Sequence, residues 1–305
     1  MEAEKILFVS HRVPDTDTVG SALALGVYAD NLGKKISYFC VNKIPSNFYF
    51  LKNCQLFTDD AAVFRDEYDL IIFMDCSELH RAGVPDILSN KKQTWISIDH
   101  HLFKEQVGDF EIRDDRAAAN CEIIYKFFKH KNFIIAPQVA TMLLSGLLLD
   151  TGCLSNAATR SDTVIMASEL CSLGADFKVI FQSFYLNKNL GILKFWGAAL
   201  ERLKYDEASG LATTALFADD MADIAEPEEA AGGLSNFLNA VLNYDAVMVL
   251  RESPQGVRGS VRSAGNVSAS DIAARYGGGG HEKAAGFTCE GKIVERENGW
   301  GVEGA

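Results

Sequence analysis

Three apolar runs in the first half of the chain end abruptly in polar side chains. The runs and the residues that follow them are Lys5–Val9 with His11, Tyr68–Met74 with Asp75, and Thr94–Ile98 with Asp99, His100 and His101. Continuous apolar runs of this length are typical of strands that are buried on both faces of a parallel sheet. Ligands of open α/β sheets bind at the carboxyl ends of the strands, where these polar residues would lie.

Segments with helical periodicity alternate with these strands. A helix from Gly20 to Leu32 and a strand over Ile36–Val41 predict a right-handed βαβ unit, with His11, Asp15 and Asp17 on its strand-to-helix loop. Later helices are predicted at Asn120–His130, Gln138–Leu149, Ser161–Leu173 and Phe177–Tyr185, and the second of them ends in Asp150-Thr151-Gly152. Asp150 is therefore another carboxylate at the end of an element.

The pattern changes near residue 187. A linking helix over Asn187–Lys204 is followed by β-type runs at Gly210–Phe217, Tyr244–Glu252 and Gly256–Ser263, a helix over Ser270–Tyr276, and four glycines before His281. We expect an α/β protein with a parallel-sheet domain over residues 1–186, a linker helix over 187–205 and a smaller α/β domain over 206–305. The extreme C-terminus looks frayed.

Charge and cysteine content narrow the functional classes. The 305 residues include 41 acidic and 29 basic side chains, and the net charge of −12 argues against a binder of long nucleic acid. A short nucleotide in a local basic pocket is compatible with that charge.

The seven cysteines form no C-x-x-C pair and are expected to be reduced thiols in a cytosolic protein. Ile6–Val9 is too short for a signal sequence and Val139–Leu149 too short to span a bilayer, so we expect a cytoplasmic protein without a membrane partner.

The polar residues at the element ends combine carboxylates and imidazoles without a thiol. The set is His11, Asp15, Asp17, Asp75, Asp99, His100, His101 and Asp150. This composition favours hard divalent cations, and the imidazoles shift the preference from Mg²⁺ toward Mn²⁺, Fe²⁺, Co²⁺ or Zn²⁺. Two such ions would relieve the repulsion among the aspartates and could together activate a water for phosphoryl displacement. Helix capping by the aspartates and a histidine pair at a sheet edge are the structural alternatives, but they require a separate explanation for each residue.

In order and spacing, these residues resemble the four motifs of the DHH phosphoesterases. The motifs are His11-x-x-x-Asp15-x-Asp17, Asp75, Asp99-His100-His101 and Asp150-Thr151-Gly152. In the second half, Ser260-Val261-Arg262-Ser263 and the segment from Gly277 to Gly286 resemble the DHHA1 substrate-binding domain. The resemblance covers nearly the whole chain, and the combination of motifs is more specific than any one of them.

The resemblance implies a role for each matched residue. His11, Asp15 and Asp75 would hold one Mn²⁺, and Asp17, Asp75, His100 and Asp150 would hold a second, with Asp75 shared. Asp99 would orient its neighbours, and His101 would face the substrate phosphate as a hydrogen-bond donor or as an acid. The substrate-binding residues would be Arg262, Ser263, Gly278, Gly279, Gly280, His281 and Arg258, although Arg258 could equally be a surface charge. Glycine lets main-chain amides approach a phosphate closely, while a flexible loop is the structural alternative.

The resemblance implies a Mn²⁺-dependent two-metal phosphodiesterase, an exoribonuclease that hydrolyses short oligoribonucleotides to mononucleotides, with 3′-phosphoadenosine-5′-phosphate (pAp) phosphatase as a second activity. The alternatives are a phosphodiesterase for the linear products of cyclic dinucleotides and a nucleotide-sensing protein without turnover. Departures from the family pattern at Leu102–Glu105, Asn120-Cys121-Glu122 and Cys153-Leu154 leave the metal ligands intact and bear on base preference and substrate length. The oligomeric state is open, a homodimer included.

Overall fold

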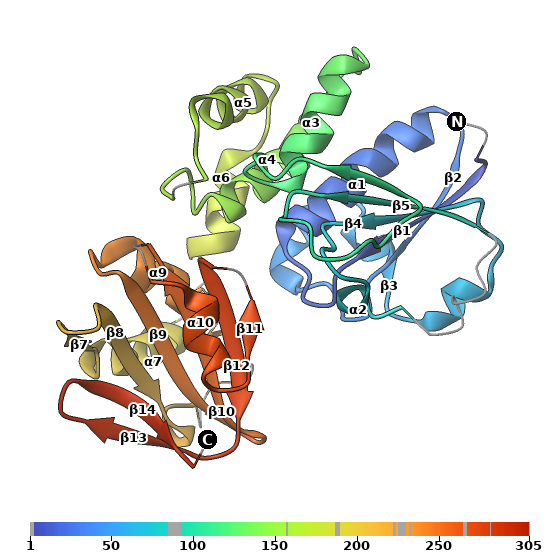
Figure 1. Cartoon of the computed structure of the whole chain (residues 1–305). Helices are drawn as coiled ribbons and strands as arrows, with labels where there is room; N and C mark the ends of the chain where they lie inside the picture. The colour runs from blue at the N-terminus through green and yellow to red at the C-terminus, as the bar shows by residue number, and fades with distance from the viewer. Residues whose placement is uncertain are drawn as a thin grey trace. The chain divides into compact units, whose positions relative to one another are not determined.

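The computed structural model describes residues 3–84, 93–156, 158–186, 190–221, 224, 230–231, 233–264, 267–280 and 282–304. The chain divides into two compact units, Met1–Leu186 and Asn187–Ala305 (Figure 1). No helix among the described residues is long and apolar enough to cross a membrane. Residues 187–189, with which the predicted linking helix begins, and His281 lie outside the described residues.

The first unit is built on a parallel six-stranded sheet. Its strands are β1 (Lys5–Ser10), β2 (Lys35–Phe39), β3 (Phe57–Thr58), β4 (Leu70–Met74), β5 (Thr94–Asp99) and β6 (Phe110–Arg113). The order is β3-β2-β1-β4-β5-β6, and every neighbouring pair is parallel. The predicted fold class is confirmed. The direction of the strand order reverses between β1 and β4, which is the switch point where such sheets bind ligands.

Helices cover both faces of this sheet. The helical segments are α1 (Thr16–Asn31), η1 (Ser46–Phe48), η2 (Cys54–Leu56), η3 (Ala61–Arg65), α2 (Leu79–Ala82), α3 (Asn120–His130), α4 (Pro137–Asp150), α5 (Ser161–Ser172), α6 (Phe177–Phe181) and the π-helix Gln182–Leu186. Ile6 and Phe8 of β1 pack in the core that contains residues of α1, α3 and α4, whereas Leu7 and Val9 pack on the opposite face with residues of α2 and η3. Burial on both faces explains why β1 has no polar alternation.

The first helix begins earlier than predicted. Its N-cap is Asp15, whose Oδ1 accepts hydrogen bonds from the main-chain N–H of Asp17 at 3.0 Å and of Thr18 at 2.9 Å. Capping of this kind satisfies amides that have no partner within the helix. The prediction that Asp17 lies on the loop was therefore wrong, because Asp17 is buried in the first turn of α1.

The second unit contains a mixed sheet. Its strands are β7 (Lys204–Asp206), β8 (Leu211–Leu216), β9 (Ala246–Ser253), β10 (Gly256–Ser263), β11 (Gly279–Gly280) and β12 (Ala284–Cys289), in the order β11-β12-β10-β9-β8-β7. The pair β8–β9 is parallel, and the other pairs are antiparallel. The helical segments are α7 (Leu190–Glu201), η6 (Ala218–Met221), α9 (Leu234–Val241) and α10 (Ala269–Ala274).

The C-terminal segment is ordered. Strands β13 (Lys292–Arg296) and β14 (Gly299–Glu303) form an antiparallel hairpin, so the expectation of a frayed terminus was wrong. Ile293 and Val302 face each other in the hairpin and are buried in the same core as residues of β9 and β10. Burial of this apolar pair offsets the entropy of ordering the terminus.

Candidate metal centre

The predicted polar residues of the first unit meet at the carboxyl edge of its sheet. Asp75 is at the centre, directly after β4, and its main-chain N–H donates to the carbonyl of Ile98 at 2.9 Å. Its φ is +57°, a left-handed conformation that is uncommon for a residue other than glycine. Such strain persists only where the surroundings fix it, and it is concentrated at functional sites.

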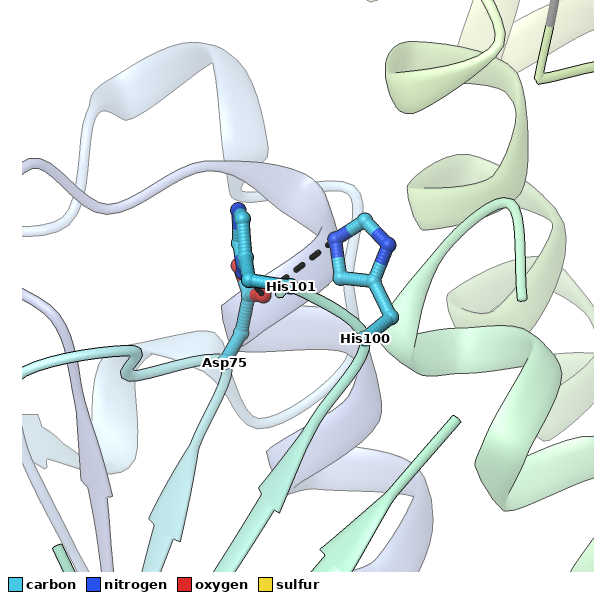
Figure 2. A group of neighbouring side chains, drawn as sticks. All are labelled: Asp75, His100 and His101. Atoms are coloured by element: carbon cyan, nitrogen blue, oxygen red, sulfur yellow. Dashed lines mark ion pairs between the residues drawn. The ribbon is translucent and has the colours of Figure 1, made fainter. Parts of the chain in front are cut away.

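The Asp75 carboxylate faces three imidazoles. Its Oδ1 is 3.4 Å from Nε2 of His100 and 3.2 Å from Nδ1 of His101, and Figure 2 shows both rings beside it. Its Oδ2 is 3.3 Å from Nε2 of His11. The two oxygens of one buried carboxylate therefore belong to two different groups of ligand atoms.

The remaining aspartates complete these two groups. Oδ2 of Asp15 is 3.4 Å from Nε2 of His11, on one side of Asp75. On the other side, Oδ2 of Asp150 is 3.2 Å from Nε2 of His100. Within each of the groups His11–Asp15–Asp75, Asp17–His100–Asp150 and Asp75–His100–His101, the potential ligand atoms lie within 4.8 Å of one another. The groups overlap at Asp75 and at His100.

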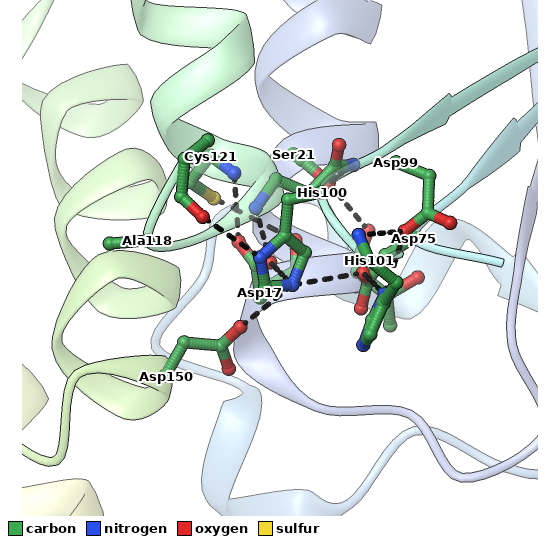
Figure 3. Close-up of polar contacts among 12 residues, drawn as sticks. Asp17, Ser21, Asp75, Asp99, His100, His101, Ala118, Cys121 and Asp150 are labelled. Atoms are coloured by element: carbon green, nitrogen blue, oxygen red, sulfur yellow. Dashed lines mark hydrogen bonds and ion pairs between the residues drawn. The ribbon is translucent and has the colours of Figure 1, made fainter. Parts of the chain in front are cut away.

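Asp17 is held by the start of another helix. Its Oδ2 accepts from the main-chain N–H of Asn120 at 2.6 Å, and its Oδ1 accepts from that of Cys121 at 2.8 Å (Figure 3). The amides at a helix N-terminus carry partial positive charge and stabilise a carboxylate there. The side chain is fully buried, and its Oδ2 is 3.9 Å from Nε2 of His100. No local sequence pattern indicates this contact, because Asn120 lies 103 residues from Asp17 in the chain.

The imidazoles are strongly influenced by the carboxylates. Burial by itself would lower the pKa of His11, but Asp15 and Asp75 outweigh it and raise the pKa to about 10. Burial would also lower the pKa of His101, but Asp75 and Asp99 outweigh it and raise that pKa to about 9. Without metal ions, the imidazoles therefore hold the protons that balance the carboxylates.

The carboxylates divide into two kinds. Burial would raise the pKa of Asp75, but the hydrogen-bonded and charged rings of His101 and His11 lower it well below its usual range. Burial raises the pKa of Asp17, and the neighbouring charge of Asp150 adds to the rise. The concentration of acid groups at this edge thus requires nearby positive charge, which either protons or metal ions can supply.

The donor set fits divalent cations. Among the described residues, Oδ1 of Asp75, Nε2 of His100 and Nδ1 of His11 are buried and lack a well-oriented hydrogen bond. Buried polar atoms are rarely left in this state, and two of these three atoms lie inside the ligand groups. Carboxylate oxygens with imidazole nitrogens are the ligands that Mn²⁺ and related ions prefer. The division of individual ligands between two ions stays a prediction.

Comparisons with known proteins identify the family. The profile of the DHH family, N-terminal domain, matches residues 5–147, and that of the DHHA1 domain matches residues 214–298. The chain is a DHH-family phosphoesterase. It is 27% identical to a protein of Thermus thermophilus named bifunctional oligoribonuclease and PAP phosphatase NrnA, over 95% of this chain and 86% of that protein.

Two further similarities cover 95% and 48% of the chain. An exopolyphosphatase-related protein from Bacteroides fragilis has a crystal structure that matches with a TM-score of 0.87 and 25% identity, over 95% of this chain and 88% of that chain. A probable manganese-dependent inorganic pyrophosphatase from Enterococcus faecalis is 26% identical over 48% of this chain and 48% of its own length.

In the DHHA1 domain, the predicted substrate residues lie on β10 and in the glycine segment. Arg262 and Arg258 share one face of β10, as its alternating burial shows. Nε of Arg262 donates to Oδ1 of Asn236 at 2.6 Å, and burial lowers the pKa of Arg262 without an opposing carboxylate. Ser263 is on the opposite face, where its hydroxyl donates to the carbonyl of Val267. The structure therefore does not bring Ser263 together with Arg262.

The glycines differ in what they require. A Cβ on Gly278 would lie 2.3 Å from the carbonyl oxygen of Gly286, so β11 and β12 can approach only with glycine there. Gly280 has a φ of +146°, which a larger residue rarely adopts. Gly279 is exposed, and a Cβ on it would meet nothing within 4 Å among the described residues. Sheet packing thus explains Gly278 and backbone conformation explains Gly280, whereas neither explains Gly279.

Proposed function

We propose that this DHH-family phosphoesterase is a Mn²⁺-dependent two-metal phosphodiesterase that hydrolyses short oligoribonucleotides to mononucleotides and also dephosphorylates pAp. The observation that carries the proposal is the position of Asp75, which offers one oxygen to each of two neighbouring ligand groups. The name of the Thermus thermophilus relative supports the two substrates, and the name of the Enterococcus faecalis relative supports manganese.

The residues divide into two sets around Asp75. We assign His11 and Asp15 to one ion, and we assign Asp17, His100 and Asp150 to the other. Two bound cations would neutralise phosphoryl oxygens and increase the acidity of water. His101 would donate a proton or a hydrogen bond to the leaving oxygen, since its ring is held at the edge of the site by Asp99.

The second unit is assigned to substrate binding. We propose that residues 1–186 form the catalytic domain, that 187–205 link the domains, and that 206–305 bind the substrate phosphates. Arg262 and Gly279 are suited to an anion, because they combine a cationic side chain with exposed main chain, and the resemblance to the DHHA1 domain adds His281. A net charge of −12 favours short substrates over long nucleic acid.

A substrate panel tests the proposal. Purified protein is incubated with Mn²⁺ and separately with a 5′-phosphorylated diribonucleotide, a long oligoribonucleotide, pAp, pApA and pyrophosphate, and kcat/KM is compared. We expect the diribonucleotide and pAp to be turned over far better than the long oligomer and pyrophosphate, with two Mn²⁺ bound per chain. A strong preference for pApA would favour the linear-dinucleotide alternative. Binding of pAp without turnover under any divalent ion would contradict the enzyme assignment.

A further inference from the structure

Arg113 ends the edge strand β6 directly beside the DHH motif. In the parallel register of β5 and β6, Arg113 is paired with Asp99. One guanidinium nitrogen, Nη1, donates to Oδ2 of Asp99 at 2.7 Å and to the main-chain carbonyl of His101 at 2.8 Å. Arg113 therefore contacts both the carboxylate that precedes the two histidines and the backbone of the second histidine.

Arg113 is itself held in place. Its other terminal nitrogen, Nη2, donates to Oε2 of Glu111 at 3.1 Å. The other oxygen of Glu111 accepts from the main-chain N–H groups of Val107 at 2.9 Å and Gly108 at 2.8 Å. The ring of Phe103 covers the guanidinium, with its centroid 5.5 Å from Cζ. Only 13% of the Arg113 side chain is exposed, so this cation is fixed rather than a mobile surface charge.

Asp99, which Arg113 holds in place, is in turn hydrogen-bonded to His101. Oδ1 of Asp99 accepts from Nδ1 of His101 at 2.7 Å and from its main-chain N–H at 3.1 Å, and Figure 3 draws the two side chains in contact. An ionised carboxylate can only accept hydrogen bonds. Nδ1 of His101 is therefore the donor in this hydrogen bond, and the carboxylate fixes the plane of the ring.

We propose that Arg113 is a positioning residue for the hydrolysis: through Asp99 it holds the ring of His101 with Nδ1 on Asp99 and Nε2 directed at the substrate. This inference rests on the proposed function. Asp99 is fully buried, and removal of the cation would leave a buried carboxylate without its charge partner. Without this partner the carboxylate could rotate, and His101 would lose the acceptor that fixes its ring.

Kinetics of matched variants test the inference. Arg113→Gln is expected to lower kcat on the diribonucleotide about 10- to 100-fold, the usual cost of losing a partner behind an active-site ligand, with KM within about twofold of wild type. Arg113→Lys keeps the charge but not the planar fork, so it should restore part of kcat. Arg116→Gln is the control, because the Arg116 side chain is 86% exposed on the same segment. An Arg113→Gln enzyme with the kcat of the control would overturn the inference.

A double-variant cycle separates positioning from strand stability. If Arg113 acts through His101, Arg113→Gln should cost less than about twofold in kcat when His101 is already alanine. A loss of the same size in both backgrounds would refute the proposal and leave Arg113 as a stabiliser of β6. Thermal unfolding of each variant identifies any that fail to fold, and Arg113→Lys then serves in place of Arg113→Gln.

Nitrogen NMR of the histidines gives a readout independent of turnover. In wild-type protein loaded with diamagnetic Mg²⁺, the resonances assigned by means of His101→Ala should show Nδ1 protonated and hydrogen-bonded. In Arg113→Gln the Nδ1 resonance should move toward that of a ring without a fixed acceptor, and unchanged shifts would contradict the inference. Because this result does not depend on substrate, it can fail while the substrate panel succeeds, and the reverse also holds.

Discussion

The substitution Gly146→Ala tests how closely the metal centre depends on helix packing. Gly146 lies on α4, where a Cβ would be 2.6 Å from Oδ1 of Asp17, 2.8 Å from its Cα and 2.5 Å from Sγ of Cys121. Two of these atoms belong to Asp17, whose buried carboxylate accepts hydrogen bonds from the first turn of α3. The Cα of Asp17 is main chain and cannot turn away, so the methyl group can be accommodated only if the helices separate.

The size of the effect follows from these distances. Ordinary contact begins near 3.4 Å, so the clash with Oδ1 requires a displacement of about 0.8 Å. Overpacking of this kind costs about 1–3 kcal/mol, and the higher helix propensity of alanine returns roughly 1 kcal/mol. The net expected loss is up to about 2 kcal/mol in the free energy of unfolding. A displacement of this size in the site is expected to lower kcat by up to about 100-fold.

Urea unfolding, Mn²⁺ titration calorimetry and diribonucleotide kinetics measure the three consequences. The matched control is Gly197→Ala on α7, where a Cβ meets nothing within 4 Å among the described residues. That control should gain up to about 1 kcal/mol and keep wild-type activity and Mn²⁺ affinity. Gly146→Ala should be less stable than the control and bind Mn²⁺ more weakly. Equal stability and equal kcat in the two variants would refute the packing argument.

Three further predictions concern the shared carboxylate, the orientation of Arg262 and the dependence on pH. Asp75→Ala is expected to lower kcat/KM by on the order of 10³-fold or more and to abolish tight Mn²⁺ binding. The control Asp59→Ala, in an exposed loop, should leave kcat/KM and Mn²⁺ binding unchanged. Full activity of Asp75→Ala would contradict the assignment of the centre. Asn236→Ala should raise KM about 10-fold with kcat unchanged, because it removes the acceptor for Nε of Arg262. Asn239→Ala on the same helix is the control. An unchanged KM in Asn236→Ala would argue against a substrate role for Arg262. Burial would raise the pKa of Asp220, but Arg202 and the Phe217 amide lower it below its unfolded value near 3.9. The contribution of Asp220 to folding stability is therefore present above about pH 3.9 and is lost as the pH falls through the lower pKa of the folded state. Asp220→Asn should therefore lower the free energy of unfolding by about 1 kcal/mol or less at pH 7 and by less at pH 3, and a constant difference in urea titrations would exclude this linkage.

The strand ends could be predicted because their signal is local. An apolar run that stops at Asp75 or at Asp99-His100-His101 contains both the strand and its functional end within a few residues. The shared role of Asp75 could not be derived in this way. It depends on the left-handed conformation of that residue and on the neighbouring positions of β1 and β5, and only the resemblance to the family suggested it.

Residues that act across elements were missed for a different reason. Arg113 stands on a short strand beside the exposed residues Phe110 and Ile112, a pattern that indicates surface rather than site. Its contact with Asp99 depends on the register of β5 and β6, which no local pattern specifies. The hydrogen bond from the first turn of α3 to the Asp17 carboxylate likewise joins segments that are far apart in the chain. Sequence patterns therefore indicate the candidate ligands better than the groups that orient them.

The hydrogen bonds of the aspartates indicate where a cation would matter most. Oδ1 of Asp15 caps α1, both oxygens of Asp17 accept main-chain amides, and Asp99 is bound by Arg113 and His101. These carboxylates are positioned by the fold before any ligand arrives. Oδ1 of Asp75 is different: it is buried among imidazoles without a well-oriented hydrogen bond, on a residue with strained backbone. The fold thus fixes the surrounding carboxylates and leaves the central oxygen for the metal, because a preorganised shell lowers the cost of placing the cation there.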